Sequence, residues 1–160
     1  MYVQLLQAES ENMADIHTCR LETILVVDDT QVIRNYVVAI LEEAHFKVIS
    51  ADNGANAIEL AKQTVGTIDL LLSDVDMPLM SGPVLGQTLK KARPELQVML
   101  MSGGADGNLL VLNYGWAFIE KPFVPKKLVQ MVNNVLHSPD RSQPGGDEFD
   151  SRKDTQNLQY

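Results

Sequence analysis

Short runs of hydrophobic residues recur along the chain, separated by longer amphipathic stretches. The run at residues 68–72 consists of Ile and Leu apart from Asp69, and it is too short for a typical helix. Such a run is typical of a strand buried on both faces of a sheet. Comparable runs predict four further strands, at residues 23–27, 47–51, 97–101 and 117–119.

Between these runs, hydrophobic residues recur at spacings of three and four, which predicts amphipathic helices. The first helix begins after Thr30, a candidate N-cap. Its apolar positions are Ile33, Tyr36, Val37, Ile40, Leu41 and Ala44. Further helices are marked by Ala57, Ile58, Ala61 and Val65, by Val84, Leu85, Thr88, Leu89 and Ala92, and by Leu128, Met131, Val132, Val135 and Leu136. A short, weakly patterned helix is expected within residues 106–113.

Five apolar strands alternating with helices predict an α/β fold, in which helices cover both faces of a parallel sheet through right-handed crossovers. This pattern occupies residues 22–137 and predicts one domain. Residues 1–21 show no sustained period, so we expect a flexible N-terminal extension. Residues 138–160 are polar and contain Pro and Gly, so we expect a disordered C-terminal tail.

Composition narrows the function classes. The formal net charge of −8 argues against a nucleic-acid or anionic-membrane surface. Cys19 is the only cysteine, which excludes an intramolecular disulfide and a cysteine-based metal site. No apolar run has the length of a membrane span, and the N-terminus lacks the positive region of a secretory signal. By elimination, we expect a soluble cytoplasmic protein.

Chemically active residues follow several of the predicted strands. Asp28, Asp29, Asp74, Ser102 and Lys121 each come at or directly after a strand's carboxyl end. These ends share one edge of a parallel sheet, so the side chains should converge. A single acid there would usually be an N-cap or a solvated loop residue, but three together repel one another unless a cation binds. Oxygen ligands without His or Cys favour Mg²⁺ or a similar ion such as Mn²⁺. A carboxylate beside such an ion can attack phosphorus and form an aspartyl phosphate.

The combined pattern resembles the receiver domain of two-component response regulators over about residues 22–137. The matching segments are Asp28-Asp29, Asp74 with Met77-Pro78 and Gly82, Ser102-Gly103, and Phe118 with Lys121-Pro122. No single segment is specific, but their joint order and strand context are. The resemblance implies a flavodoxin-like, doubly wound, five-stranded parallel sheet with strand order 2-1-3-4-5.

The resemblance also implies a metal site. It makes Asp29 a direct Mg²⁺ ligand and Asp28 a ligand through water. Asp76 would bind the ion through its backbone carbonyl, and Asp74 would share it.

The same resemblance assigns the phosphoryl chemistry. Asp74 would be the phospho-acceptor, and Lys121 would hold the phosphoryl group. Ser102 would hydrogen-bond the phosphoryl oxygen, Phe118 would be the rotameric switch aromatic, and the Lys121-Pro122 bond would be cis.

The function that follows is a stand-alone receiver in a phosphorelay, with no enzymatic activity beyond its own phosphorylation and dephosphorylation. Its partners would be a histidine kinase or histidine phosphotransfer protein and an unknown downstream protein. One alternative is a Mg²⁺-dependent phosphatase of the haloacid dehalogenase type, whose Asp-x-Asp signature could match Asp74-Val75-Asp76. That signature belongs on a first strand, however. A second alternative is a degenerate receiver that binds a partner without phosphorylation.

Overall fold

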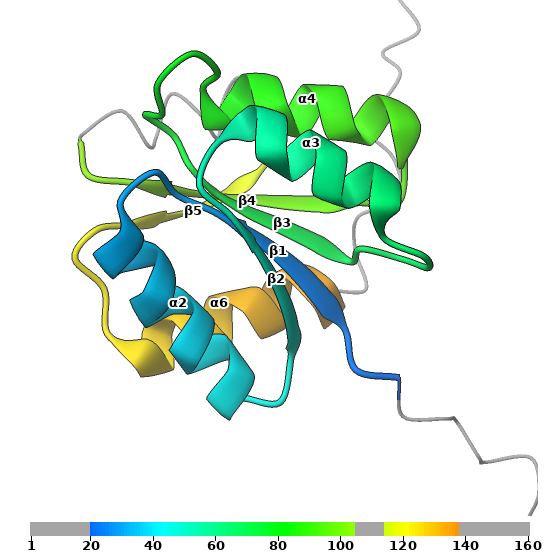
Figure 1. Cartoon of the computed structure of the whole chain (residues 1–160). Helices are drawn as coiled ribbons and strands as arrows, with labels where there is room; N and C mark the ends of the chain where they lie inside the picture. The colour runs from blue at the N-terminus through cyan, green and yellow to red at the C-terminus, as the bar shows by residue number, and fades with distance from the viewer. Residues whose placement is uncertain (1–19, 105–113, 138–160) are drawn as a thin grey trace, which may run out of the picture.

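The computed structural model describes residues 20–104 and 114–137, which contain a five-stranded parallel sheet (Figure 1). The strands are β1 (Thr23–Val27), β2 (Lys47–Ala51), β3 (Leu70–Asp74), β4 (Gln97–Ser102) and β5 (Ala117–Glu120). Their order in the sheet is β2-β1-β3-β4-β5. This confirms the predicted flavodoxin-like order 2-1-3-4-5 and places every carboxyl end at one edge.

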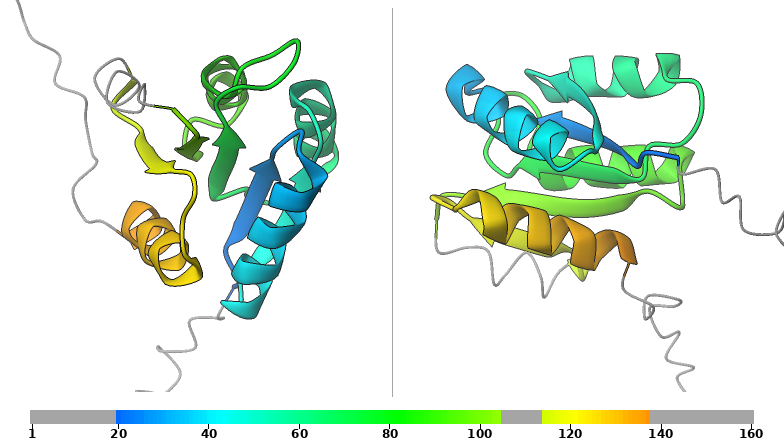
Figure 2. Two further views of the ribbon diagram at one scale, coloured as in Figure 1. Left: turned by 90° about the vertical axis from the view of Figure 1, so that its left-hand side faces the viewer. Right: turned by 90° about the horizontal axis from the view of Figure 1, so that it is seen from below.

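Helices cover both faces of this sheet. They are α2 (Gln31–Glu43), α3 (Gly54–Gln63), α4 (Gly82–Ala92) and α6 (Pro125–His137). Figures 1 and 2 show α2 and α6 on one face and α3 and α4 on the other. None of the described helices is long and apolar enough to cross a membrane. The helix expected within residues 106–113, the tail at 138–160 and nearly all of the N-terminal extension lie outside the described residues.

Each face of the sheet has its own hydrophobic core, because successive strand residues point to opposite faces. Ile24 and Val26 of β1 belong to the core under α2 and α6. Leu25 and Val27 belong to the core under α3 and α4. All four are fully buried, so β1 is enclosed on both sides as its unbroken apolar run predicts.

The strand expected at residues 68–72 actually spans 70–74, a shift that places two polar residues inside the sheet. Ser73 and Asp74 pair with Leu100 and Met101 of β4, and this pairing carries the strand on to Asp74. The hydrophobic run therefore began and ended the strand two residues too early, because the buried Ser73 and Asp74 are polar. Asp74 remains at the carboxyl end, as predicted.

Three features of the surface differ from what the hydrophobic pattern predicts. Strand β2 lies at the edge of the sheet and is only partly buried, with Lys47 and Ser50 exposed. Val65 follows the end of α3 and is 97% exposed, so it does not belong to that helix's apolar face. Val84 of α4 is also exposed, because that helix packs through Leu85 and Leu89 instead.

Candidate functional site

Three carboxylates meet at the carboxyl edge of the sheet. Asp28 and Asp29 directly follow β1, and Asp74 is the last residue of the adjacent strand β3. One carboxylate oxygen from each of the three lies within 4.8 Å of the others. Among the described residues, this is the one group of three or more potential metal-binding side chains. The sequence therefore placed the acidic cluster correctly.

Lys121 reaches this cluster from the end of the edge strand β5. It directly follows β5, and its backbone amide donates to the carbonyl of Ser102 over 2.7 Å. Its Nζ donates to Asp28 Oδ2 over 2.8 Å and to Asp74 Oδ1 over 3.0 Å. The Lys121-Pro122 peptide is cis, as the family resemblance implied. The structure thus brings together four residues that are up to 93 positions apart in sequence.

Burial and charge act in opposite directions within this cluster. Burial raises the pKa of Asp74, and the neighbouring Asp28 adds to the rise, while the hydrogen bond and charge of Lys121 partly oppose it. Burial by itself would lower the pKa of Lys121, but its hydrogen bonds with Asp28 and Asp74 outweigh this and raise it. Lys121 is therefore a firmly protonated ammonium that faces more carboxylates than it can neutralise.

Asp28 is held in place at each of its three oxygen atoms. Its Oδ1 accepts from the amide of Thr30 over 2.9 Å, and its Oδ2 accepts from Lys121. Its backbone carbonyl accepts from Nη1 of Arg34 over 2.6 Å. Thr30 is the N-cap residue of α2 as expected, but its side chain makes no capping bond. The contact with Arg34 had no signal in the sequence beyond its place in the first turns of α2.

Helix α4 and the side chain of Ser73 hold the backbone at Asp74 in place. Helix α4 begins at Gly82, whose amide donates to the carbonyl of Val75 over 3.0 Å. The buried Ser73 donates its hydroxyl to the carbonyl of Asp74 over 2.9 Å. A side chain at Gly82 would collide with that carbonyl, so glycine allows α4 to start directly behind the acid. The sequence analysis did not single out Ser73.

The remaining predicted site residues are less closely tied to the cluster. Ser102 ends β4 next to the site, and its hydroxyl lies 3.3–3.4 Å from the backbone of Gly104. Phe118 of β5 is partly buried against the core beneath α3 and α4. Asp76 is exposed in the loop after β3 and is not one of the clustered carboxylates.

The carboxylate oxygens of the cluster suit a hard divalent cation as ligands. Every potential metal ligand in the cluster is a carboxylate oxygen, and the one ammonium pairs with two of the three carboxylates, Asp28 and Asp74. Such oxygen-only sites suit Mg²⁺ or Mn²⁺ rather than zinc. Asp29 is exposed and has a free approach from solvent, whereas both carboxylate oxygens of Asp28 already accept hydrogen bonds.

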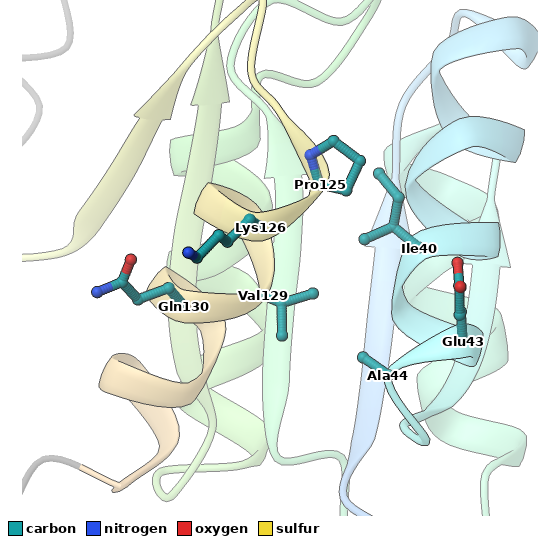
Figure 3. Close-up of a pocket in the computed structure, with 7 residues that line it drawn as sticks. All are labelled: Ile40, Glu43, Ala44, Pro125, Lys126, Val129 and Gln130. Atoms are coloured by element: carbon teal, nitrogen blue, oxygen red, sulfur yellow. The ribbon is translucent and has the colours of Figure 1, made fainter.

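A separate groove of about 520 Å³ lies between α2 and α6. Its lining is Ile40, Glu43, Ala44, Pro125, Lys126, Val129 and Gln130. Figure 3 shows Ile40 of α2 and Ala44, the residue that caps the end of α2, facing Pro125 and Val129 of α6. The groove has one acid and one lysine rather than a carboxylate cluster, so it lacks the metal-binding chemistry of the sheet edge.

Comparison with known proteins identifies the family. The model of the response regulator receiver domain matches residues 24–133. The response regulator receiver protein CpdR of Brucella abortus is 34% identical over 122 residues, covering 72% of this chain and 98% of that protein. The sensor kinase CckA of Brucella abortus is 32% identical over 121 residues, covering 74% of this chain but 13% of that kinase. The chain thus spans only a small part of the larger sensor kinases that it matches.

Solved structures agree with this assignment. A response regulator receiver domain protein from Clostridium thermocellum superposes with a TM-score of 0.67 at 26% identity, covering 72% of this chain and 94% of that one. The receiver domain of the hybrid histidine kinase CckA gives a TM-score of 0.58 at 36% identity, covering 71% and 98%. With a family model that matches most of its length, this chain belongs to the response regulator receiver domain family.

Proposed function

We propose that this receiver domain accepts a phosphoryl group on Asp74 in a Mg²⁺-dependent reaction. The observation that carries the proposal is the cluster itself, in which Asp74 lies within 4.8 Å of Asp28 and Asp29 and is bonded to Lys121. The donor would be a histidine kinase or a histidine phosphotransfer protein. The similarity to receivers within the sensor kinases CckA and LuxN supports that donor class.

The transfer needs one nucleophile and a way to neutralise negative charge. A carboxylate oxygen of Asp74 attacks phosphorus, the bond from phosphorus to the donor's histidine nitrogen breaks, and the histidine leaves as its nitrogen takes up a proton. The product is an acyl phosphate on Asp74. Lys121 is placed to neutralise the phosphoryl oxygens, since its ammonium already lies 3.0 Å from Asp74.

A divalent cation would be held by Asp28, Asp29 and Asp74, with Asp76 contributing its backbone carbonyl as the resemblance implies. When bound, the ion supplies positive charge beside the incoming phosphoryl group. The protein's part is to hold the ligands. Thr30 and Arg34 orient Asp28, and Ser73 and Gly82 fix the backbone at Asp74.

Phosphorylation would then act as a switch. It adds about −1.5 to −2 charge and new acceptor oxygens at Asp74. Lys121 would exchange its bond with Asp74 for the phosphoryl group, and Ser102 would exchange its contact with Gly104. Inward movement of Ser102 would leave space for Phe118 to change rotamer. The modification would thereby shift a two-state equilibrium that a downstream protein reads.

The phosphatase alternative has little support. Asp74-Val75-Asp76 begins at the last residue of the third strand, whereas the acid pair that directly follows the first strand is Asp28-Asp29. Asp76 is exposed and lies outside the carboxylate cluster. The alternative of a degenerate receiver also has little support, because the acids and the lysine that phosphorylation needs lie together in this structure.

The proposal is tested by incubating the protein with Mg²⁺ and acetyl phosphate and measuring its intact mass. We expect one phosphoryl group per chain, which does not form when EDTA is present from the start of the reaction and is absent from Asp74→Asn. Glu59→Gln removes an exposed carboxylate on α3 and serves as the matched control, which should load normally. An adduct that persists in Asp74→Asn, or no adduct in the wild type, would refute phosphorylation at Asp74.

A further inference from the structure

Large hydrophobic side chains are exposed at the same edge of the sheet as the acidic cluster. Among the described residues, the exposed large hydrophobics are Leu21, Val32, Tyr36, Val65, Leu79, Val84 and Val124. Val32 follows β1, Leu79 follows β3 and Val124 follows β5, and all three are more than 60% exposed. The same three strands deliver Asp28, Asp74 and Lys121, so the segments that carry these hydrophobic side chains leave the sheet at the edge where the site lies.

Leu79 differs from the other exposed hydrophobics in its backbone. It is fully exposed and has a φ of 68°, in the left-handed region. For a residue with a Cβ, this conformation costs about 1–2 kcal/mol. His45 is the other non-glycine residue with positive φ in the described part of the chain. It has a structural reason, because the bonds His45 N to Glu42 O and Phe46 N to Leu41 O close the C-terminus of α2.

The loop around Leu79 is fixed by its neighbours. Met77 is buried in the core beneath α3 and α4. Met80 packs on the start of α3, where a Cβ on Gly54 would lie 2.7 Å from its sulfur. The amide of Met80 also donates to the carbonyl of Pro78 over 2.8 Å. These contacts hold Leu79 at the tip of the loop, where glycine would fit without strain and where its own side chain is fully exposed.

We propose that Leu79 is a recognition residue for the protein that donates the phosphoryl group, with Val32 and Val124 completing an apolar collar around the acidic site. This inference rests on the proposed function. The side chain of Asp74 is only 13% exposed, so a donor histidine reaches it only if the donor's surface closes over this edge. A phosphorylated donor is also an anion that approaches three carboxylates. Apolar contacts at the collar offset that repulsion and favour one donor over another.

A small phosphoryl donor distinguishes an effect on docking from an effect on phosphoryl transfer. Acetyl phosphate reaches Asp74 without contacting the collar, so a variant that impairs docking alone should slow only the protein donor. The experiment measures the phosphorylation rate with acetyl phosphate and with a panel of purified, autophosphorylated histidine kinase cores and histidine phosphotransfer proteins. The fastest protein donor for the wild type is then used for each variant. Leu79→Gly is the informative variant, since it removes the side chain and relieves the backbone strain.

Two control variants separate recognition from other effects. His45→Gly relieves the same strain away from the site, and Val65→Ser removes an exposed hydrophobic at the opposite edge of the sheet. We expect Leu79→Gly to lower the ratio of protein-donor rate to acetyl-phosphate rate by about tenfold, the size of a strong interface contact. Both controls should keep the wild-type ratio.

The outcomes distinguish this inference from the proposed function. An unchanged ratio in Leu79→Gly overturns the role of Leu79, even if acetyl phosphate loads Asp74 normally. Failure of every protein donor on a wild type that acetyl phosphate phosphorylates overturns the partner class. Failure of acetyl phosphate itself overturns the proposed function.

Discussion

Gly82 lies so close to Asp74 that a Cβ added to it would come within 2.2 Å of the Asp74 carbonyl oxygen. No side-chain rotation relieves that contact, because both partners are backbone or Cβ atoms. The first turn of α4 is therefore in direct contact with the strand end that carries the proposed phospho-acceptor.

Gly82→Ala should destabilise the domain by about 1–3 kcal/mol or more, since the extra atom forces α4 away from β3. Urea unfolding followed by circular dichroism measures the change in the free energy of unfolding. Gly103→Ala is the matched control, because a Cβ there meets nothing within 4 Å. Equal unfolding midpoints for both variants would show that α4 can shift without cost.

Lys121→Met should destabilise the metal-free domain by about 3 kcal/mol, because breaking a buried ion pair leaves an uncompensated charge. The carboxylate of Asp28 is completely buried and would lose the partner at its Oδ2. Adding Asp28→Asn should recover part of the loss, since the neutral amide needs no counter-ion. Thermal unfolding of the single and double variants in EDTA measures the coupling, and strictly additive losses would contradict it.

Magnesium should stabilise Lys121→Met more than it stabilises the wild type. In the wild type, the ammonium already neutralises part of the charge of Asp28 and Asp74, so it competes with the cation for them. Its removal should increase the affinity for Mg²⁺, and a ligand that binds only the folded state raises the unfolding temperature. Titration of Mg²⁺ in thermal unfolding measures both shifts. A smaller shift in the variant would mean that Lys121 does not compete with the ion.

The sequence predicted the sheet and the acidic cluster well for one physical reason. Buried parallel strands have unbroken hydrophobic runs, and their carboxyl ends must share an edge. The position of each run therefore placed Asp28, Asp74 and Lys121 near one another before any contact was known. Element ends were less accurate where polar residues remain in the sheet, as at Ser73, whose buried hydroxyl is satisfied by a neighbouring carbonyl.

Other features depend on tertiary contacts that no local pattern reveals. Arg34 reads as an ordinary helix residue, yet its guanidinium bonds the carbonyl of Asp28. The left-handed backbone at Leu79 arises because Met77 and Met80 are anchored on either side of it. Leucine gives no sequence signal for such a conformation, in contrast to glycine or asparagine.

Arg93→Ala should destabilise the domain by about 2 kcal/mol or more, because even one hydrogen bond from a charged group contributes about 1.5–3 kcal/mol. The Arg93 guanidinium donates to the carbonyls of Ala61, Thr64 and Gly66, over 2.7, 3.1 and 2.8 Å. It thereby satisfies backbone groups at the end of α3. Hydrogen exchange should show faster opening of the last turn of α3. The exposed Lys91, two residues earlier, provides Lys91→Ala as a control that should leave that exchange unchanged.

Gly86→Ala should displace Trp116, because a Cβ on Gly86 would lie 2.9 Å from two indole carbons, Cη2 and Cζ3. The indole stacks on Tyr114 with ring centroids 4.8 Å apart, so a shift must disturb that contact, and Val98 lies 3.2 Å from the added Cβ on another side. We expect a loss of about 1–3 kcal/mol in the free energy of unfolding, as for other overpacked sites. Trp116 is the only tryptophan in the chain, so its fluorescence reports the displacement directly. Trp116→Phe should remove most of the penalty of Gly86→Ala, since the smaller ring lacks the atoms that collide; an additive double variant would place the clash elsewhere.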